Sequence, residues 1–189
     1  METTTTSLGQ FISSHRADLI ARCIAKVSRP ADFAAADDGS SGIPAFIDQL
    51  VVELGHGASM TNQIRDGAAE HGNNLFFRGF TASEVVHVYG SVCQSVTDLA
   101  VESTAAFSAD DFRTLNRCLD DAIASAVSEY TRQQRIESEG QAMGKNIEMR
   151  NLVYAAITAF EALQTGAIGV SGTTGALLHR SLLGLRALL

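Results

Sequence analysis

Five histidines are the side chains in this sequence best suited to acid–base, phosphoryl-transfer or metal chemistry at neutral pH. They are His15, His56, His71, His87 and His179, and no two of them stand at the spacing of metal ligands. His56 lies between two glycines and His71 precedes one, which is typical of helix ends. An exposed position on a helix is the simplest account of His179. The spacing therefore predicts no metal site.

Paired acids are the next candidates for chemistry. Asp110-Asp111 and Asp120-Asp121 are adjacent in sequence, so on a helix their side chains diverge by about 100°. We expect these acids to be caps or surface groups, not a catalytic dyad. The sequence also contains no nucleophile elbow and no phosphate-binding loop of the G-x-x-x-x-G-K-[ST] form.

The distribution of charge excludes some partners. The chain has 189 residues and a net charge of −7, from 14 Lys and Arg against 21 Asp and Glu. From Arg135 onward five bases face four acids, so the first 134 residues carry −8 and the remainder +1. An acidic front half argues against nucleic acid as the partner, because phosphate binding needs a concentrated basic face.

No apolar run reaches the roughly 18 to 20 residues that a membrane span needs. The first seven residues, Met1–Ser7, lack both the basic segment and the apolar core of a secretory signal, so we expect a cytoplasmic protein with no membrane partner. Cys23, Cys93 and Cys118 are widely spaced and odd in number. In such a protein they are most simply buried thiols.

Apolar residues recur at helical spacing along almost the whole chain, and no convincing strand is present, so the fold class is predicted to be all-α. Breaks are expected at Pro30 and over Ala34–Gly42, and Pro44 is acceptable in the first turn of the helix that follows. Apolar stripes predict helices over Phe11–Val27, Ile43–Leu54, Ser59–Phe77, Val85–Leu99, Phe112–Tyr130, Ile147–Leu163 and Leu177–Leu189. The helix over Ser59–Phe77 is looser than the others and is expected to be interrupted near Gly72–Asn74. A polar helical continuation is expected over Thr131–Gln141, and a turn over Thr165–Gly175.

Two helix starts are marked by capping sequences. Thr81-Ala-Ser-Glu84 has the form of a capping box, and Ser108-Ala-Asp-Asp111 places an acid at the reciprocal position. Gly140 and Gly144 each weaken the polar helix by about 1 kcal/mol relative to alanine, but no proline interrupts it.

The last 55 or so residues are predicted to form a helical hairpin rich in Ala and Leu. A two-helix hairpin cannot bury such a surface alone, so pairing with a second copy into a four-helix bundle is expected. The alternative is that the hairpin folds back on its own N-terminal domain. If the helix from Asp111 continues to Leu163, it measures about 80 Å and can connect a sensing domain to a dimer bundle.

Several short segments, in this order, resemble one subgroup of bacterial sensor histidine kinases. Glu148-Met-Arg-Asn-Leu152, followed by Ala159-Phe-Glu-Ala-Leu163 and the glycine-rich turn, is similar to their phosphoacceptor hairpin, as are Ser171–Ala176 and Arg180-Ser-Leu182. Val85–Gly90, Cys93, Thr97 and Phe112–Asp120 look like the N-terminal helical domain of that subgroup, which is related to globin-like sensor modules of the RsbRD type. The resemblance covers nearly all of the chain.

The phosphoacceptor position departs from the family. The family carries a histidine immediately before the glutamate, whereas this chain carries Ile147 before Glu148. Isoleucine has no lone pair with which to attack a phosphate. The chain also reaches Leu189 without an ATP-binding domain, so we do not expect it to act as a kinase. Glu148, Arg150 and Asn151 are interpreted either as remnants of a phosphotransfer face that still touches a response regulator, or as ordinary exposed polar positions.

The resemblance to a globin-like module makes His87, Tyr89 and His71 the candidates for binding a small ligand. His87 lies between two valines and is a possible ligand to haem if the helices open a pocket. Otherwise no cofactor is expected.

The resulting prediction is a non-catalytic signalling protein of the two-component type. It has a globin-like helical sensor domain over residues 1–132, a long connecting helix, and a degenerate dimerisation hairpin over residues 133–189. We expect it to act as a homodimer or by pairing with a histidine kinase. The alternatives are a phosphotransfer protein that relays phosphate through His179, and a sensor of a small ligand or haem.

Overall fold

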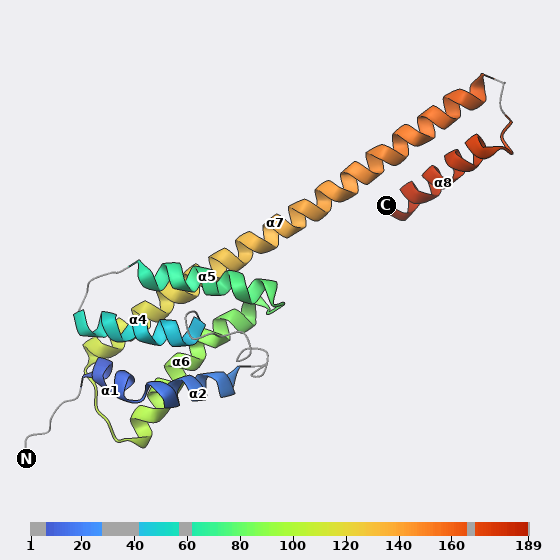
Figure 1. Ribbon diagram of the computed structural model, residues 1–189. Coiled ribbons are helices and arrows are strands. Elements are labelled where there is room, and N and C mark those ends of the chain that lie inside the picture. The colour runs from blue at the N-terminus through green and yellow to red at the C-terminus, as the bar shows by residue number, and fades with distance from the viewer. Residues whose placement is uncertain (1–6, 28–41, 57–61, 166–168, 189) are drawn as a thin grey trace, which may run out of the picture. The chain divides into compact units, whose positions relative to one another are not determined.

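The protein is seen here in a computed structural model, which describes residues 7–27, 42–56, 62–165 and 169–188. Every regular element in these ranges is a helix, which confirms the all-α prediction. The predicted break at Pro30 and over 34–41 lies outside the described residues. The helices are α1 (Leu8–Ser14), α2 (Arg16–Lys26), α4 (Gly42–His56), α5 (Gln63–Phe77), α6 (Ala82–Glu102), α7 (Ala109–Gln164) and α8 (Thr173–Leu188) (Figure 1).

The chain divides into two compact units. We call Met1–Gln134 the N-terminal unit and Arg135–Leu189 the C-terminal unit, and α7 contributes residues to both. No helix in the described part of the chain is both long enough and apolar enough to span a membrane.

Local hydrogen bonds at the helix starts agree with the capping sequences. The Glu84 N–H donates to Thr81 Oγ1 at 3.2 Å, and the Thr81 N–H donates to Glu84 Oε2 at 2.7 Å. Ser108 and Asp111 exchange the same two bonds, each 3.1 Å long, so aspartate replaces glutamate in this box. A third capping box, at Ser7 with Gln10, was not predicted.

The first apolar stripe is divided between two helices. His15 has φ −111° and ψ 17°, which ends α1, and its backbone N–H donates to the Phe11 carbonyl. Its Nδ1 lies 2.9 Å from the same carbonyl oxygen. The apolar residues of both helices nevertheless face the core, since Ile12 of α1 and Leu19 of α2 are both fully buried.

The predicted interruption near Gly72–Asn74 was wrong, because α5 runs without a break from Gln63 to Phe77. Gly72 is required there by packing. A Cβ atom on Gly72 would lie 2.2 Å from the carbonyl oxygen of Ala126 in α7. Only a residue without a side chain lets the two helix backbones approach this closely. His71 is therefore not at a helix end, as the glycine suggested, but six residues before it.

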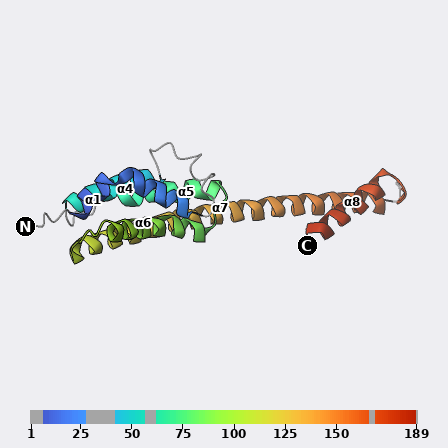
Figure 2. The ribbon, with the colours of Figure 1, turned by 90° about the horizontal axis from the view of Figure 1, so that it is seen from below.

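The core of the N-terminal unit lies between two groups of helices. Figure 2 shows α1, α4 and α5 on one side and α6 with the beginning of α7 on the other. α1 packs against α4, α2 packs against α6 and α4 packs against α5. The largest fully buried side chains are Tyr89, Leu8, Ile12, Leu19, Ile43, Ile47, Leu50, Leu75, Leu115, Val85 and Val88.

After Tyr130, α7 continues as an exposed helix, which confirms the expected solvated continuation. Gly140 and Gly144 lie within it, and a Cβ atom at either position would meet nothing within 4 Å. These glycines therefore have no packing role within the chain.

The described residues of the C-terminal unit form a helical hairpin, as predicted. α8 begins at Thr173, so the expected turn over Thr165–Gly175 is shorter than predicted, and residues 166–168 of it lie outside the described residues. A Cβ atom on Gly184 of α8 would lie 3.0 Å from a methyl carbon of Leu152 in α7. The absence of a side chain at Gly184 therefore makes room for Leu152 between the two helices of the hairpin.

Candidate functional site

Two of the predicted ligand-binding residues meet inside the N-terminal unit. His71 of α5 and Tyr89 of α6 are 4% and 1% exposed, and Nδ1 of His71 lies 3.1 Å from the hydroxyl of Tyr89. The ring of Tyr89 also packs edge to face with Phe46 of α4, with ring centroids 5.3 Å apart and planes at 88°. Three helices thus position one polar and aromatic cluster.

Burial keeps this cluster uncharged. It lowers the pKa of His71 to about 4, and the positive charge of Arg78 acts in the same direction. Burial also raises the pKa of the Tyr89 hydroxyl above its usual value. At neutral pH both groups are neutral, so the hydrogen bond between them joins two uncharged partners.

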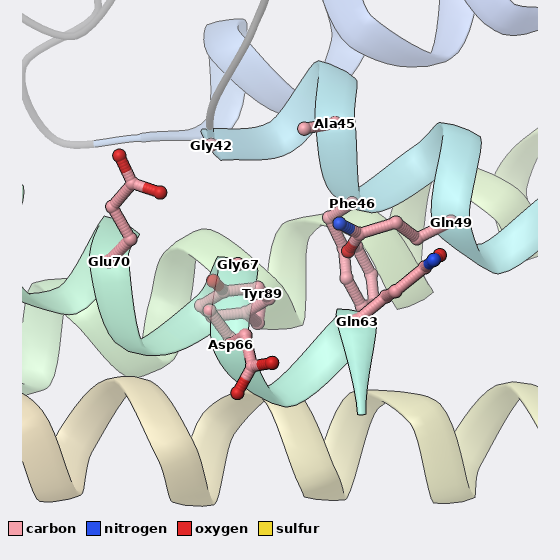
Figure 3. A pocket seen from close by; sticks show the side chains of 10 residues that line it. Gly42, Ala45, Phe46, Gln49, Gln63, Asp66, Gly67, Glu70 and Tyr89 are labelled. Atoms are coloured by element: carbon pink, nitrogen blue, oxygen red, sulfur yellow. The ribbon is translucent and has the colours of Figure 1, made fainter. Parts of the chain in front are cut away.

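A cavity of about 310 Å³ opens beside this cluster, with Tyr89 among its lining residues. Figure 3 shows Gln49 of α4 and Gln63 of α5 at one end of it and Glu70 of α5 at the other. The lining residues are Gly42, Ala45, Phe46, Gln49, Gln63, Asp66, Gly67, Ala68, Glu70 and Tyr89.

The chemistry of the lining is acidic and amidic. Asp66 and Glu70 stand one helical turn apart on α5, and Figure 3 shows their carboxylates pointing away from each other. Among the lining residues that the structure describes, none is an arginine, a lysine or a histidine. Gly67 lies between the two acids, and a Cβ atom there would come 3.0 Å from Nε2 of Gln49. The glycine therefore makes room for this amide.

The other histidines do not join the cluster. His87 is exposed on α6 and does not line the cavity, and His179 is exposed on α8. Among the described residues, no group of three His, Cys, Asp or Glu side chains stands close enough to hold a metal ion. Haem binding and phosphotransfer through His179 stay predictions.

The segment that resembles a phosphoacceptor helix in sequence lies on the second half of α7. Glu148, Arg150 and Asn151 are exposed, and Ile147 is 41% exposed. This placement is compatible with both interpretations of the polar residues, a contact face for another protein or an ordinary solvated surface.

The cysteines are not paired. Cys23 and Cys118 are buried and Cys93 is half-buried, and all three are free thiols. Burial raises the pKa of Cys23, so this side chain is a neutral thiol at physiological pH.

The sequence pointed to Tyr89 and His71 but missed the cavity residues Phe46, Asp66 and Glu70. The spacing of Asp66 and Glu70 is a local signal that places two acids one helical turn apart, and it was available from the sequence. Nothing local shows that Phe46 of α4 faces Tyr89 of α6, because 43 positions separate them along the chain.

Comparison with known protein families gives one match. The family model described as "RsbT co-antagonist protein rsbRD N-terminal domain" matches residues 16–143, which is more than half of the chain. The matched range ends before Ile147, so it does not test the resemblance of the hairpin to histidine kinases. No curated protein and no solved structure matches the chain, and the globin-like arrangement stays a prediction.

Proposed function

Since the chain belongs to the RsbRD N-terminal domain family, we propose that it is a signalling protein that acts by association. The N-terminal unit responds to a signal, and the C-terminal unit pairs with a second helical hairpin. The family is described by the words "RsbT co-antagonist protein", and an antagonist role is consistent with action by association.

The observation that carries the proposal is the exposed apolar surface of the C-terminal unit. Among its described residues only Ala156, Ala159 and Ser181 are buried. Many exposed large apolar side chains on one small unit are typical of an interaction surface. The large apolar residues exposed in this unit are Ile136, Met143, Ile147, Val153, Tyr154, Ile157, Phe160, Val170, Leu177, Leu182 and Leu183.

The first partner we propose is a second copy of this chain. Two hairpins that pack their apolar faces together form a four-helix bundle, in which each chain covers the surface that the other cannot bury alone. A histidine kinase with an intact hairpin of the same kind is the alternative partner. Because Ile147 cannot accept a phosphoryl group, the chain would change the output of such a kinase by pairing and not by chemistry.

Helix α7 belongs to both units, so a change in the N-terminal unit can reach the C-terminal unit through it. Leu115, Ala122 and Ala126 of its first half are fully buried in the core of the N-terminal unit. Ile157 and Phe160 of its second half are 47% and 52% exposed. A rearrangement of the N-terminal core that shifts α7 would therefore act on the helix that carries the pairing surface.

Light scattering after size-exclusion chromatography tests the pairing. We expect the full chain to have close to twice the 20.0 kDa mass of one copy at a protein concentration of roughly 10 μM. This requires a dissociation constant below roughly 1 μM, which is about −8 kcal/mol of association. The double variant Ile157→Glu, Phe160→Glu should be a monomer, because it places charges in the apolar interface.

Val101→Glu is the matched control, because Val101 is 73% exposed on α6 in the N-terminal unit. It should leave the dimer intact. A monomeric wild-type chain, or equal loss of the dimer in the control, contradicts the proposal.

A further inference from the structure

An exposed stripe runs along the part of α7 that belongs to the C-terminal unit, and we call it the outer stripe. Its residues follow one another at steps of four and three, which keeps them on one face of the helix. Four of the six are large and apolar, and these four are between 41% and 66% exposed. The outer stripe consists of Ile136, Gly140, Met143, Ile147, Arg150 and Tyr154.

The outer stripe faces away from α8. Leu152, which approaches Gly184 of α8, lies about 140° round the helix from Ile147. Ala156 and Ala159, the buried residues of this half of α7, lie on the same side as Leu152. Every residue from 134 to 148 is exposed in the described structure. A helix gains most of its stability by packing its apolar face, so this stretch becomes more stable when another helix covers it.

A shallow groove follows the same face and carries opposite charges at its two ends. Glu139 stands at one end and Arg150 at the other, with apolar side chains between them. Glu139 also lies 3.7 Å from Arg135 of its own helix, but both side chains are more than 70% exposed, so this pair contributes little. The groove is lined by Glu139, Ala142, Met143, Asn146, Ile147 and Arg150.

The outer stripe is complementary to a second copy of itself that runs in the opposite direction. With a two-fold axis beside residue 145, Ile136 lies opposite Tyr154 of the second copy, and Met143 lies opposite Ile147. Gly140 lies opposite Arg150, so the smallest residue of the stripe meets the longest, and the guanidinium reaches Glu139 beside that glycine. Gly140 has this room, because a Cβ atom there would meet nothing within 4 Å. A parallel pairing would instead place Arg150 against Arg150 and leave a gap at Gly140.

We propose that α7 binds a second copy of this chain in antiparallel orientation through the outer stripe. This contact goes beyond the pairing of hairpins proposed above, because the outer stripe ends before Ile157 and Phe160, and it joins hairpin dimers into larger assemblies. One helix face from each chain is less than the surface that a stable dimer buries. We therefore expect a dissociation constant between roughly 0.1 and 1 mM.

Disulfide cross-linking between full-length chains tests the contact and its orientation. Ile136→Cys chains are mixed with Tyr154→Cys chains at roughly 1 mM and oxidised mildly. Both carry Cys93→Ser, because Cys93 is the native thiol that is not fully buried. We expect a disulfide between positions 136 and 154 of different chains, identified by the mass of the linked peptides, and none between two Ile136→Cys chains. A disulfide between two Ile136→Cys chains shows a parallel pairing, and the absence of any disulfide shows no contact; either result overturns the proposal.

Charge reversal tests the pairing of Glu139 with Arg150. Glu139→Arg and Arg150→Glu should each lower the yield of the disulfide at least about fivefold, because like charges then meet. The chain with both changes should recover the yield, since the opposite charges are only exchanged. Glu148→Arg is the matched control, because Glu148 is exposed on α7 about 160° round the helix from Arg150. No recovery in the double variant, or equal loss in the control, overturns the assignment.

The mass at low concentration keeps this test separate from the test of hairpin pairing. At roughly 10 μM the contact through the outer stripe is scarcely populated, so a dimer at that concentration reports on the hairpins alone. Such a dimer without the disulfide between positions 136 and 154 overturns the contact through the outer stripe and leaves the hairpin pairing standing. The disulfide in a chain that is monomeric at low concentration supports the outer stripe and contradicts the hairpin pairing.

Discussion

The two units of this protein use similar apolar residues in opposite ways. In the N-terminal unit Leu50, Leu75 and Leu115 are fully buried among surrounding helices. In the C-terminal unit Leu177, Leu182 and Leu183 are between 40% and 53% exposed, although they lie on a regular helix. The difference shows that helical periodicity alone does not tell whether an apolar stripe finds its partner within the chain.

The number of helices in each unit explains the difference. A helix needs neighbours on its apolar side, and the described N-terminal unit supplies them from α1, α2, α4, α5, α6 and the first half of α7. The described C-terminal unit has only the second half of α7 and α8. The first unit is therefore expected to be stable alone, whereas the second needs another chain.

The strongest test of this comparison uses two glycines. Gly72→Ala should destabilise the protein by about 3–5 kcal/mol, because the added Cβ would lie 2.2 Å from a backbone oxygen of α7 that cannot move independently. Gly140→Ala should instead stabilise α7 by about 0.5–1 kcal/mol, since nothing lies within 4 Å and alanine favours the helix. Urea unfolding measures both, and equal effects would show that Gly72 is not at a close helix contact.

The next test compares two leucines truncated in the same way. Leu115→Ala should cost about 2–5 kcal/mol at any protein concentration, because it opens a cavity in a core that is complete within one chain. Leu182→Ala should lower the free energy of unfolding of the monomer by less than about 1 kcal/mol, because Leu182 is 53% exposed. If the C-terminal units pair, the cost at Leu182 should rise with protein concentration. A concentration-independent cost at Leu182 would show that its surface has no partner.

The third test uses pH and should affect the N-terminal unit. The unfolded chain protonates His71 near pH 6.5, whereas the folded chain does so only near pH 4. The contribution of neutral His71 to the free energy of unfolding is therefore fully present above pH 6.5. It is lost as the pH falls towards 4, and the total loss is about 3 kcal/mol. Hydrogen exchange should show this loss in α5 and α6.

His71→Gln is the control for the pH test, because glutamine does not titrate. The difference in unfolding free energy between the wild-type chain and this variant should shrink as the pH is lowered from 6.5 to 4. A constant difference would mean that His71 titrates equally in the folded and unfolded states.

Features set by neighbouring residues were predictable from the sequence. The capping boxes at Thr81–Glu84 and Ser108–Asp111 join residues three positions apart, so the residue types and their spacing are enough to predict the hydrogen bonds. Ser7 and Gln10 form a third box at the same spacing. The solvated half of α7 and the hairpin after it were likewise predictable from local pattern.

Features set by contacts between distant residues were not predictable. Glycine weakens a helix, so the sequence around Gly72 favours an interruption, whereas the backbone of Ala126 that requires this glycine lies 54 positions away. His87 and Tyr89 looked equally suitable as ligands in the sequence. Only the packing of α6 places Tyr89 inside and leaves His87 exposed.

The sequence by itself determined that the chain is helical and where most helices begin. These properties depend on residue type and on interactions within one or two turns. The tertiary structure decided that His71, Tyr89 and Phe46 meet beside an acidic cavity. It also decided which apolar stripes are buried. Both results depend on how separate helices pack, because burial is a property of the neighbours that a side chain finds and not of the side chain itself.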